Sequence, residues 1–121
     1  MSTSNSQLEK TTSKFDSLRL FLAKETVQSQ LKNAVGDNSD SFAASIIDLY
    51  TGDTYLQNSQ PELVVMQSMQ AAVLKLPVIK SLGFTYIVPY KSDGKLIPQL
   101  QIGYKGLIQL AIRTNQYRII N

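Results

Sequence analysis

Two cations and an amide recur every four residues near the C-terminal end of the sequence: Lys105, Gln109 and Arg113. In an α-helix this spacing places side chains on one face, and the apolar residues between them are typical of the opposite face. The run follows Gly103 in the sequence Gly-Tyr-Lys-Gly, which indicates a turn from a strand into a helix. Amides at a helix N-terminus attract anions, and a Lys and an Arg on one exposed face add attraction for phosphates. The alternative is an ordinary solvated face, since Lys and Arg commonly cover helices.

Aromatic side chains lie among the basic residues of the same region. Single-strand nucleic-acid binders combine cations, which track the phosphate backbone, with aromatic rings on which bases stack. Tyr104 and Tyr117 are the candidates for stacking, whereas Tyr86 and Tyr90 fit the edge of a core with the hydroxyl at water. Phosphate contacts and stacking carry no base code, so sequence-independent binding is expected. The cations that interleave with these tyrosines are Lys91, Lys95, Lys105 and Arg118.

The residue types that are missing exclude most catalytic chemistry. The sequence has no His and no Cys, which excludes the Ser-His-Asp and Cys-His arrangements and the usual zinc sites. It also lacks the GxxxxGK[ST] phosphate loop of nucleotide hydrolases. The paired acids at 37 and 40 and at 48 and 53 fall near predicted helix ends, where solvated carboxylates are the norm. The sequence therefore predicts a protein that is not an enzyme and that uses no cofactor or metal.

The net charge of +3 combines an acidic half with a basic half. Residues 1–74 carry five Lys or Arg and eight Asp or Glu, whereas residues 75–121 carry seven Lys or Arg and one acid, Asp93. Clustered positive charge is typical of a protein that binds a polyanion. Opposite charge on the two halves also allows copies of the chain to associate head to tail.

A β-hairpin is predicted directly before the basic helix. Residues 84–90 alternate with a period of two, which predicts a strand whose even-numbered residues share one face. An Asp-Gly turn follows, because Gly tolerates the positive φ that tight turns require, and residues 96–102 form the second strand. Pro89 and Pro98 lack a backbone donor, so each is expected where its strand is unpaired on that side.

Two helical regions are predicted at the start of the chain. Apolar residues recur at helical spacing over residues 15–35, with a break near residues 23–26 and Gly36 as a left-handed cap. A second amphipathic helix is predicted over residues 42–51, ended by Gly52.

A third helix is predicted from a capping box that begins at Ser59. Pro61 is tolerated in the first turn, and the helix is expected to run to about Leu76 with Val73 in its buried stripe. Helices followed by a β-hairpin and a helix indicate an α+β fold class, with the sheet covered on one side.

The two ends of the sequence differ from its middle. Residues 1–13 are rich in Ser, Thr, Asn and Gln and predict a flexible tail, and residues 14–121 predict one domain. No apolar run approaches the roughly 20 residues needed to cross a bilayer, and the N-terminus lacks a secretory pattern, so a cytoplasmic protein without a membrane partner is expected. Residues 117–121 resemble the start of an unpartnered strand, which predicts a domain that is incomplete at its C-terminus.

Three blocks of sequence, in order, carry a resemblance to a known family. They read DTYLQNSQPELVVMQSMQAAVLKLP, LGFTYIVPY and IGYKGLIQLAIRTNQY. Together they resemble the N-terminal part of the RecT family of phage single-strand annealing recombinases, over roughly Val27 to Asn121. The most specific element is the strand, the GYKG turn and the following helix. The family's proteins continue well beyond the point where this chain stops.

The resemblance implies an ATP-independent protein that binds single-stranded DNA and anneals it to a complementary strand, giving an annealed duplex. Family members work as homo-oligomers, in rings or helical filaments, and a phage exonuclease is a partner that the resemblance suggests. Lys105 and Arg113 match basic positions expected to meet the DNA backbone, and Gln109 and Tyr104 lie within the same motif. The other DNA-binding candidates, which extend the positive surface and the stacking positions, are Lys91, Lys95, Tyr117 and Arg118.

A function of a different class also fits the sequence. A truncated chain that keeps its self-association surfaces without annealing DNA would act as an interaction module for a protein partner. DNA binding predicts a steep loss of affinity with salt and a large loss when Lys105 and Arg113 are both replaced by Ala, whereas a protein-interaction module shows neither.

Overall fold

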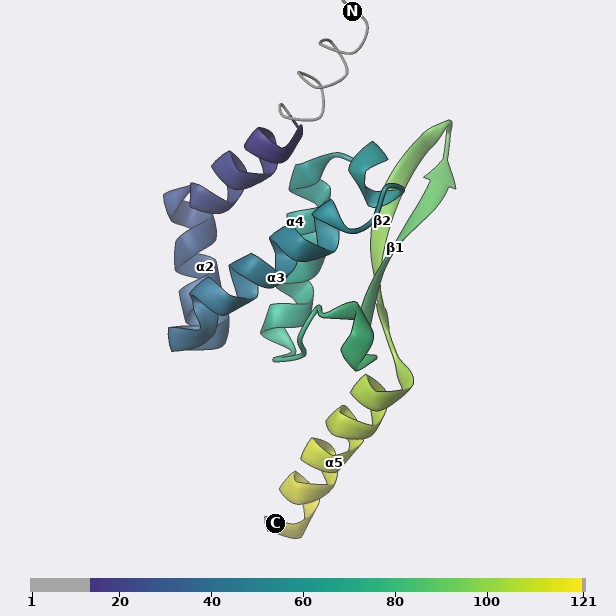
Figure 1. The fold of residues 1–121 in the computed structure, drawn as a ribbon. Helices are drawn as coiled ribbons and strands as arrows, with labels where there is room; N and C mark the ends of the chain where they lie inside the picture. Colours follow the sequence, from purple (N-terminus) through teal and green to yellow (C-terminus); the bar gives the residue numbers. More distant parts are fainter. Residues whose placement is uncertain (1–13, 121) are drawn as a thin grey trace, which may run out of the picture.

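The computed structural model describes residues 14–120, with the side chains of residues 14–114, so the predicted tail at residues 1–13 lies outside it. The fold class is α+β, as predicted: helices come first, then a two-stranded antiparallel hairpin, then one long helix (Figure 1). No helix of the described part is long and apolar enough to cross a membrane. The principal elements are α2 (Glu25–Val35), α3 (Ser39–Thr51), α4 (Pro61–Val73), β1 (Thr85–Ser92), β2 (Lys95–Ile102) and α5 (Tyr104–Ile120).

The first helices pack around a core to which α3 contributes every fourth residue. Residues 14–23 are helical and the chain bends at Lys24 before α2, which confirms the predicted break. On α3, the side chains of Phe42, Ile46 and Tyr50 are buried at the spacing of a helix face. The Phe15 ring meets the Tyr50 ring edge to face, with the centroids 5.8 Å apart. Burial raises the pKa of the Tyr50 phenol, and the nearby Glu62 carboxylate raises that pKa further.

Glycine at the end of α2 does not make the predicted left-handed cap. Gly36 has a φ of 61° but a ψ of −127°, which lies outside the left-handed helical region. The chain continues from it into the short 3-10 helix η1 (Gly36–Asn38), which leads directly into α3. The helix α3 ends at Thr51 before Gly52, as predicted.

The start of α4 corrects the predicted capping box. Pro61 is the first residue of the helix, as predicted, but the N-cap is Gln60, and no side chain caps the helix. The 3-10 helix η2 (Leu56–Asn58) ends directly before Ser59. Its hydroxyl is buried without a hydrogen-bond partner, so Ser59 is part of the packed connection between η2 and α4 rather than a cap.

The helix α4 ends at Val73, earlier than predicted, in a Schellman motif. The amide of Leu76 donates to the carbonyl of Ala71 over 3.0 Å, and the amide of Lys75 donates to that of Ala72 over 2.9 Å. Lys75 occupies the left-handed position of the motif with a φ of 58°. The prediction that Val73 is buried is wrong, because its side chain is 70% exposed. The buried stripe comprises Val64, Val65, Ser68, Ala71 and Ala72.

The hairpin pairs its two prolines with each other. The register aligns Pro89 with Pro98, in an antiparallel ladder that closes with a bond from the Gly103 amide to the Phe84 carbonyl, 2.9 Å long. Counting from that bonded pair, the proline pair falls on a position without ladder hydrogen bonds, as predicted. The Leu100 amide also points outward and donates to Oε1 of Gln67 on α4 over 2.8 Å. The hairpin is therefore fastened to α4 along the edge of β2.

The buried face of the hairpin is the one that carries the odd-numbered residues of β1. Thr85 and Ile87 are buried, and the Thr85 hydroxyl donates to the carbonyl of Pro77 over 2.8 Å. Tyr86 and Tyr90, which fall on the other face, are 37% and 42% exposed. The even-numbered face of β1 is thus the outer face of the molecule.

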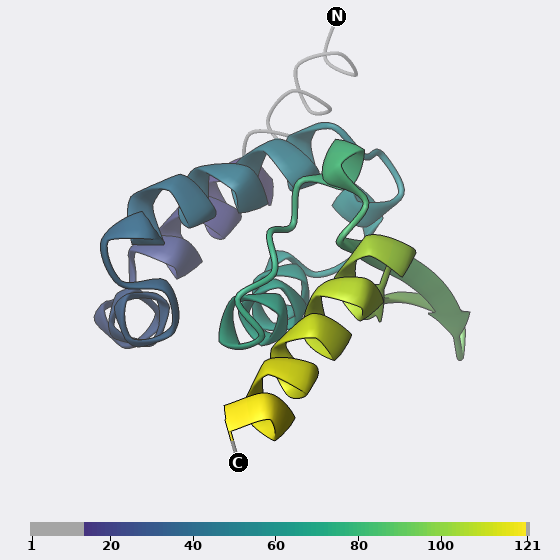
Figure 2. The ribbon, with the colours of Figure 1, turned by 90° about the horizontal axis from the view of Figure 1, so that it is seen from below.

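The helix α5 leaves the end of the hairpin and points away from the helical body (Figures 1 and 2). It continues to Ile120, so the prediction of a new strand at the C-terminal end is wrong. A helix satisfies its backbone within one segment, whereas a strand needs a partner, and the described sheet has only two strands, paired with each other.

Candidate nucleic-acid interface

The outer face of the hairpin presents aromatic and amide side chains. On β1 it carries Tyr86 and Tyr90, and on β2 it carries Gln99 and Gln101. The Gln101 side-chain amide donates a hydrogen bond to the Tyr90 hydroxyl, which orients the phenol on the exposed surface. We call this surface the outer hairpin face; it comprises Tyr86, Val88, Tyr90, Ile97, Gln99 and Gln101.

One end of the outer hairpin face is the basic hairpin tip. Lys91 and Lys95 are both exposed there; Lys95, the partner of Ser92, lies on the side of this face, and Lys91 lies on the opposite side of the sheet. Asp93 and Gly94 form the turn, with φ values of 51° and 78°, and this pair of positive angles is the one that a tight two-residue hairpin turn requires. The predicted Asp-Gly turn is confirmed, and it holds the two lysines close to each other on paired strands.

The other end is the base of the hairpin, where the two glycines of the GYKG sequence let backbones approach closely. A Cβ at Gly103 would lie 2.9 Å from Cε2 of Tyr86, and closer still to the carbonyl oxygen of Gly83. A Cβ at Gly106 would collide with the carbonyl oxygen of Phe84. Both glycines are therefore needed to seat the first turn of α5 against the start of β1.

Lys105 lies at this base, beside the ring of Tyr86. A Cβ built on Gly83 would be 3.5 Å from the Tyr86 hydroxyl oxygen and 3.7 Å from Cδ of Lys105, so both side chains pass over the same glycine. Lys105 is exposed and belongs to the first turn of α5, which contains no acidic residue. Amides of a first helical turn together with one unneutralised ammonium form a surface that attracts phosphate.

The predicted stripe of Lys105, Gln109 and Arg113 changes its surroundings along α5. Tyr104 and Lys105 are exposed at its start, with Tyr104 78% exposed, whereas Gln109 and Arg113 are half-buried. Arg113 donates from Nη1 to the carbonyl of Leu74 over 2.6 Å and from Nη2 to that of Lys75 over 3.3 Å. The stripe therefore begins at the outer surface and ends against the C-terminus of α4.

The apolar side of α5 is exposed. Leu107 is 56% exposed, and Ile108 and Ile112 are also exposed, while Leu110 is half-buried. The predicted division into an apolar side and an opposite polar side does not describe α5, because Leu110 is half-buried together with Gln109 and Arg113, whereas Lys105 is exposed together with Ile108 and Ile112. The candidates Tyr117 and Arg118 lie outside the residues whose side chains are described.

Sequence reasoning gave little weight to several residues at this interface. Lys80 lines a small hollow of about 230 Å³ together with Tyr86 and Gln101, and Asp53 lines the same hollow, so a cation and a carboxylate both lie beside the outer hairpin face. Tyr86 and Tyr90 had been assigned to a core edge. The signal that identifies their face is the β-branched pair Thr85 and Ile87, since such residues pack well on the buried side of a sheet.

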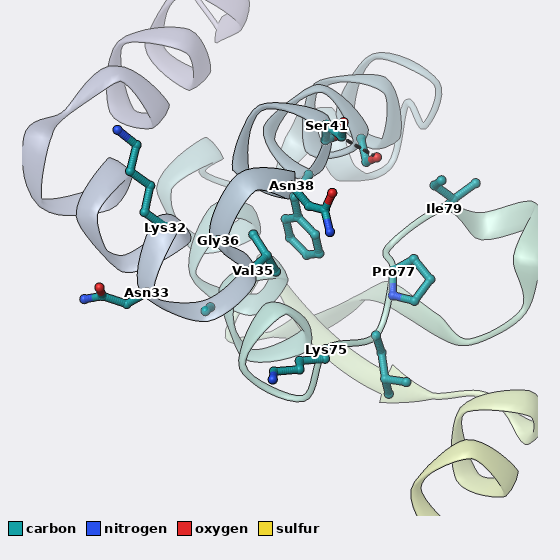
Figure 3. A pocket seen from close by; sticks show the side chains of 13 residues that line it. Lys32, Asn33, Val35, Gly36, Asn38, Ser41, Lys75, Pro77 and Ile79 are labelled. Atoms are coloured by element: carbon teal, nitrogen blue, oxygen red, sulfur yellow. Dashed lines mark hydrogen bonds between the residues drawn. The ribbon is translucent and has the colours of Figure 1, made fainter. Parts of the chain in front are cut away.

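A larger hollow, of about 660 Å³, lies away from the hairpin, between the junction of α2 with α3 and the connection that follows α4. Asn38 faces Pro77 and Ile79 across it, and the ammonium groups of Lys32 and Lys75 point away from its centre (Figure 3). Within the described residues, no group of three or more acidic side chains could hold a metal ion. The cations and exposed rings that favour a nucleic acid are gathered on the hairpin and the start of α5 instead.

Comparison with known proteins identifies the family to which the chain is similar. A family model described as RecT family matches residues 37–121 of the chain. The uncharacterized protein YqaK of Bacillus subtilis (strain 168) is 44% identical over 100 residues, which cover 83% of this chain and 34% of that protein. The chain thus spans about a third of the length of this relative. The match includes the hairpin, the GYKG turn and α5, and it confirms the resemblance inferred from the three sequence blocks.

Proposed function

The chain belongs to the RecT family, whose members are single-strand annealing proteins of DNA recombination, and from this premise we propose that it binds single-stranded DNA along the outer hairpin face. The binding needs no nucleotide hydrolysis. The observation that carries the proposal is the placement of exposed tyrosines between two basic ends, with Lys95 on the same face at the hairpin tip, Lys91 beside it on the reverse face, and Lys105 at the base.

The dimensions of the outer hairpin face suit several nucleotides. Tyr86 and Tyr90 are four residues apart on one strand, which at about 3.3 Å per residue separates their Cα atoms by about 13 Å. Each ring offers a stacking surface to a base, and such stacking contributes about 1–3 kcal/mol per base without regard to its identity. Phosphates between stacked bases are then within reach of the cations at the two ends.

The base of the hairpin supplies the phosphate contact that helix geometry favours. Lys105 acts together with the free amides of the first turn of α5, and Lys80 adds a second cation near Tyr86. Tyr104, which is highly exposed on the same turn, is a further stacking candidate. Gln109, Tyr117 and Arg118 extend the proposed surface along α5, and Arg113 joins it when its guanidinium is free.

A bound strand that contacts the protein through phosphates and through one face of each base keeps its Watson-Crick edges available. The complementary strand then pairs with it while both remain on the protein, which is the annealing step. The basic segment of residues 75–114, which carries six Lys or Arg and one acid, offsets the repulsion between the two phosphate backbones.

The wider assembly belongs to the same proposal. A homo-oligomer, in the form of a ring or a helical filament, would join the outer hairpin faces of successive copies into a continuous groove in the cytoplasm. A phage exonuclease that supplies single strands is the protein partner. The head-to-tail contact is supported by the opposite net charges of residues 1–74 and 75–121.

A second candidate is an interaction module that does not anneal DNA. The observation that favours it is the exposed apolar side of α5, formed by Leu107, Ile108 and Ile112. Exposed contiguous apolar surface marks protein-binding sites. In this alternative the chain binds a protein through α5, and the basic residues serve solubility.

Binding of a fluorescent single-stranded oligonucleotide across a salt series separates the two candidates, followed by addition of a complement that carries an energy-transfer acceptor. Tyr90→Leu removes a stacking ring from the outer hairpin face, and we expect a rise in Kd of about five- to 150-fold, which corresponds to about 1–3 kcal/mol. Tyr55→Leu is the matched control, because Tyr55 is 69% exposed and, as the residue before η2, is not part of the outer hairpin face. An equal effect of the two substitutions, or no salt-sensitive binding by a folded chain, would leave the interaction module as the better account.

A further inference from the structure

Arg113 lies where the last turn of α4 leaves backbone carbonyls unpaired. The Schellman motif uses the amides of Lys75 and Leu76, but the carbonyls of Leu74 and Lys75 lie beyond its own bonds. Nη1 and Nη2 of Arg113 donate to these two carbonyls over 2.6 and 3.3 Å. A side chain from the middle of α5 thus completes the capping of a helix that ended about 40 residues earlier.

Over residues 104–114 much of the surface of α5 is exposed rather than packed on the body. Its apolar side chains, including Leu107 and Ile112, are exposed rather than packed on the helices, and the ribbon leads away from the hairpin (Figure 2). Over residues 104–114, whose side chains are described, the helix is attached at its two ends by the glycine contacts at Gly103 and Gly106 and by the bonds of Arg113, and Gln109 and Leu110 between them are half-buried. At 1.5 Å per residue, these attachments are about 10–15 Å apart along the helix axis.

We propose that Arg113 is a releasable clasp. Its guanidinium holds α5 against the end of α4 in the DNA-free chain, and it leaves the two carbonyls when it binds a DNA phosphate. This inference rests on the proposed function. A carbonyl is a neutral acceptor, whereas a phosphate is an anion that accepts two parallel bonds from an arginine fork. The phosphate therefore competes successfully for Arg113 once a strand is held nearby by Lys105.

Release leaves no buried polar group behind. The bond to the Lys75 carbonyl is exposed and the bond to the Leu74 carbonyl is part-buried, and we infer that water replaces the guanidinium at both carbonyls. Lys75 belongs to the same turn whose carbonyls Arg113 caps. Two positively charged side chains are therefore attached near this turn. Between residues 75 and 114 the one acid is Asp93, at the distant hairpin tip, so a phosphate supplies the negative charge that this segment lacks.

The consequence for the bound state is a change in the direction of α5. Gly103 and Gly106 act as a joint because their contacts lie at the first turn of the helix. A pivot of about 30° about this joint moves Ala111, which lies about 12 Å along the axis, by about 6 Å. The same motion changes the direction in which the exposed apolar side chains of α5 point when DNA is bound.

The motion can be measured directly because the chain contains no Cys. Spin labels are placed by Ala44→Cys on α3 and Ala111→Cys on α5, both exposed positions, and labelled chain is diluted with unlabelled chain so that distances within one copy dominate. Pulsed electron resonance then gives the distance distribution with and without a single-stranded oligonucleotide. Arg113→Gln and Arg113→Lys are compared with the control Arg19→Gln, an exposed arginine of the first helical segment.

The clasp predicts one narrow distribution for the DNA-free chain and for Arg19→Gln, and a shift of up to about 6 Å with broadening on adding DNA. Arg113→Gln should reproduce that broadening without DNA, and Arg113→Lys should broaden likewise while keeping its salt-dependent affinity, since it retains charge but loses the fork. A narrow distribution in DNA-free Arg113→Gln, or an unchanged distribution in chain saturated with DNA, overturns the clasp. Failure of the unmutated chain to bind DNA at all overturns the proposed function instead, and the DNA-free comparison still decides whether Arg113 holds α5.

Discussion

Replacing Gly106 by Ala tests whether the GYKG glycines serve close packing rather than flexibility. Gly106 belongs to the first turn of α5, and its φ is not positive. In a helix without neighbours the change to Ala stabilises by about 0.5–1 kcal/mol, because Ala loses less conformational freedom on folding. On helix propensity alone, Gly106→Ala should therefore strengthen the protein.

The surroundings of Gly106 reverse that expectation. The added Cβ would lie 2.8 Å from Cγ2 of Ile102 and would collide with the carbonyl oxygen of Phe84. The Ile102 side chain can rotate away. The Phe84 carbonyl cannot, because it is part of the backbone and accepts the hydrogen bond from the Gly103 amide. Removing this clash thus requires a backbone shift. We expect its cost to lie in the upper part of the roughly 1–3 kcal/mol range for overpacking. After subtracting the propensity gain, we expect a net destabilisation of about 1–2 kcal/mol.

The assay is urea unfolding followed by circular dichroism, with amide exchange at the start of α5 as a second readout. Ala111→Gly is the control on the same helix: it is exposed, so it should lose only about 1 kcal/mol of propensity and leave exchange at Gly103 and Gly106 slow. If Gly106→Ala instead proves more stable than the unmutated chain, the packing role assigned to the GYKG glycines is incorrect.

Three further results are expected. Combined Lys91→Ala and Lys95→Ala should make the slope of log affinity for single-stranded DNA against log salt shallower by about 1.4, at about 0.7 per phosphate contact, while Lys32→Ala leaves it unchanged; equal slopes for the two variants would remove the hairpin tip from the interface. Gln67→Ala leaves the Leu100 amide without its acceptor and should lower the unfolding free energy by about 1–3 kcal/mol, whereas Gln70→Ala, exposed on the same helix, should change it by less than about 0.5 kcal/mol. Because burial raises the pKa of Tyr50 in the folded state, the unfolded phenol ionises first, so the free energy of unfolding should fall as pH rises above about 10; Tyr50→Phe should flatten this fall, and a fall that persists unchanged would assign it to other groups.

Local patterns of residues 84–102 were enough to predict the hairpin. Alternation, an Asp-Gly turn and prolines without donors are properties of a few neighbouring residues, and each constrains the backbone directly. The end of α3 before Gly52 is likewise a local event. These predictions were confirmed because the tertiary surroundings do not compete with them.

The errors arose where a distant contact decides the outcome. Alternation on β1 showed two faces but not which one is buried, since that depends on the packing of Thr85 and Ile87 against the helices. The stripe of α5 showed Arg113 on the side of Lys105, but the Leu74 carbonyl that receives it comes from 39 residues away. The capping box at Ser59 failed because η2 turns this residue inward.

The pairing of Pro89 with Pro98 affects whether the hairpin can pair with strands of other molecules and aggregate. The backbone nitrogens of both prolines point away from the partner strand, one at each edge of the hairpin, and carry no hydrogen to donate. The outward amide of Leu100 is already bonded to Gln67. A strand arriving from another molecule therefore meets a gap in the ladder on either side. With the edge of β2 fastened to α4 and the edge of β1 interrupted at Pro89, the hairpin can expose two tyrosines to solvent without acting as a template for cross-β fibrils.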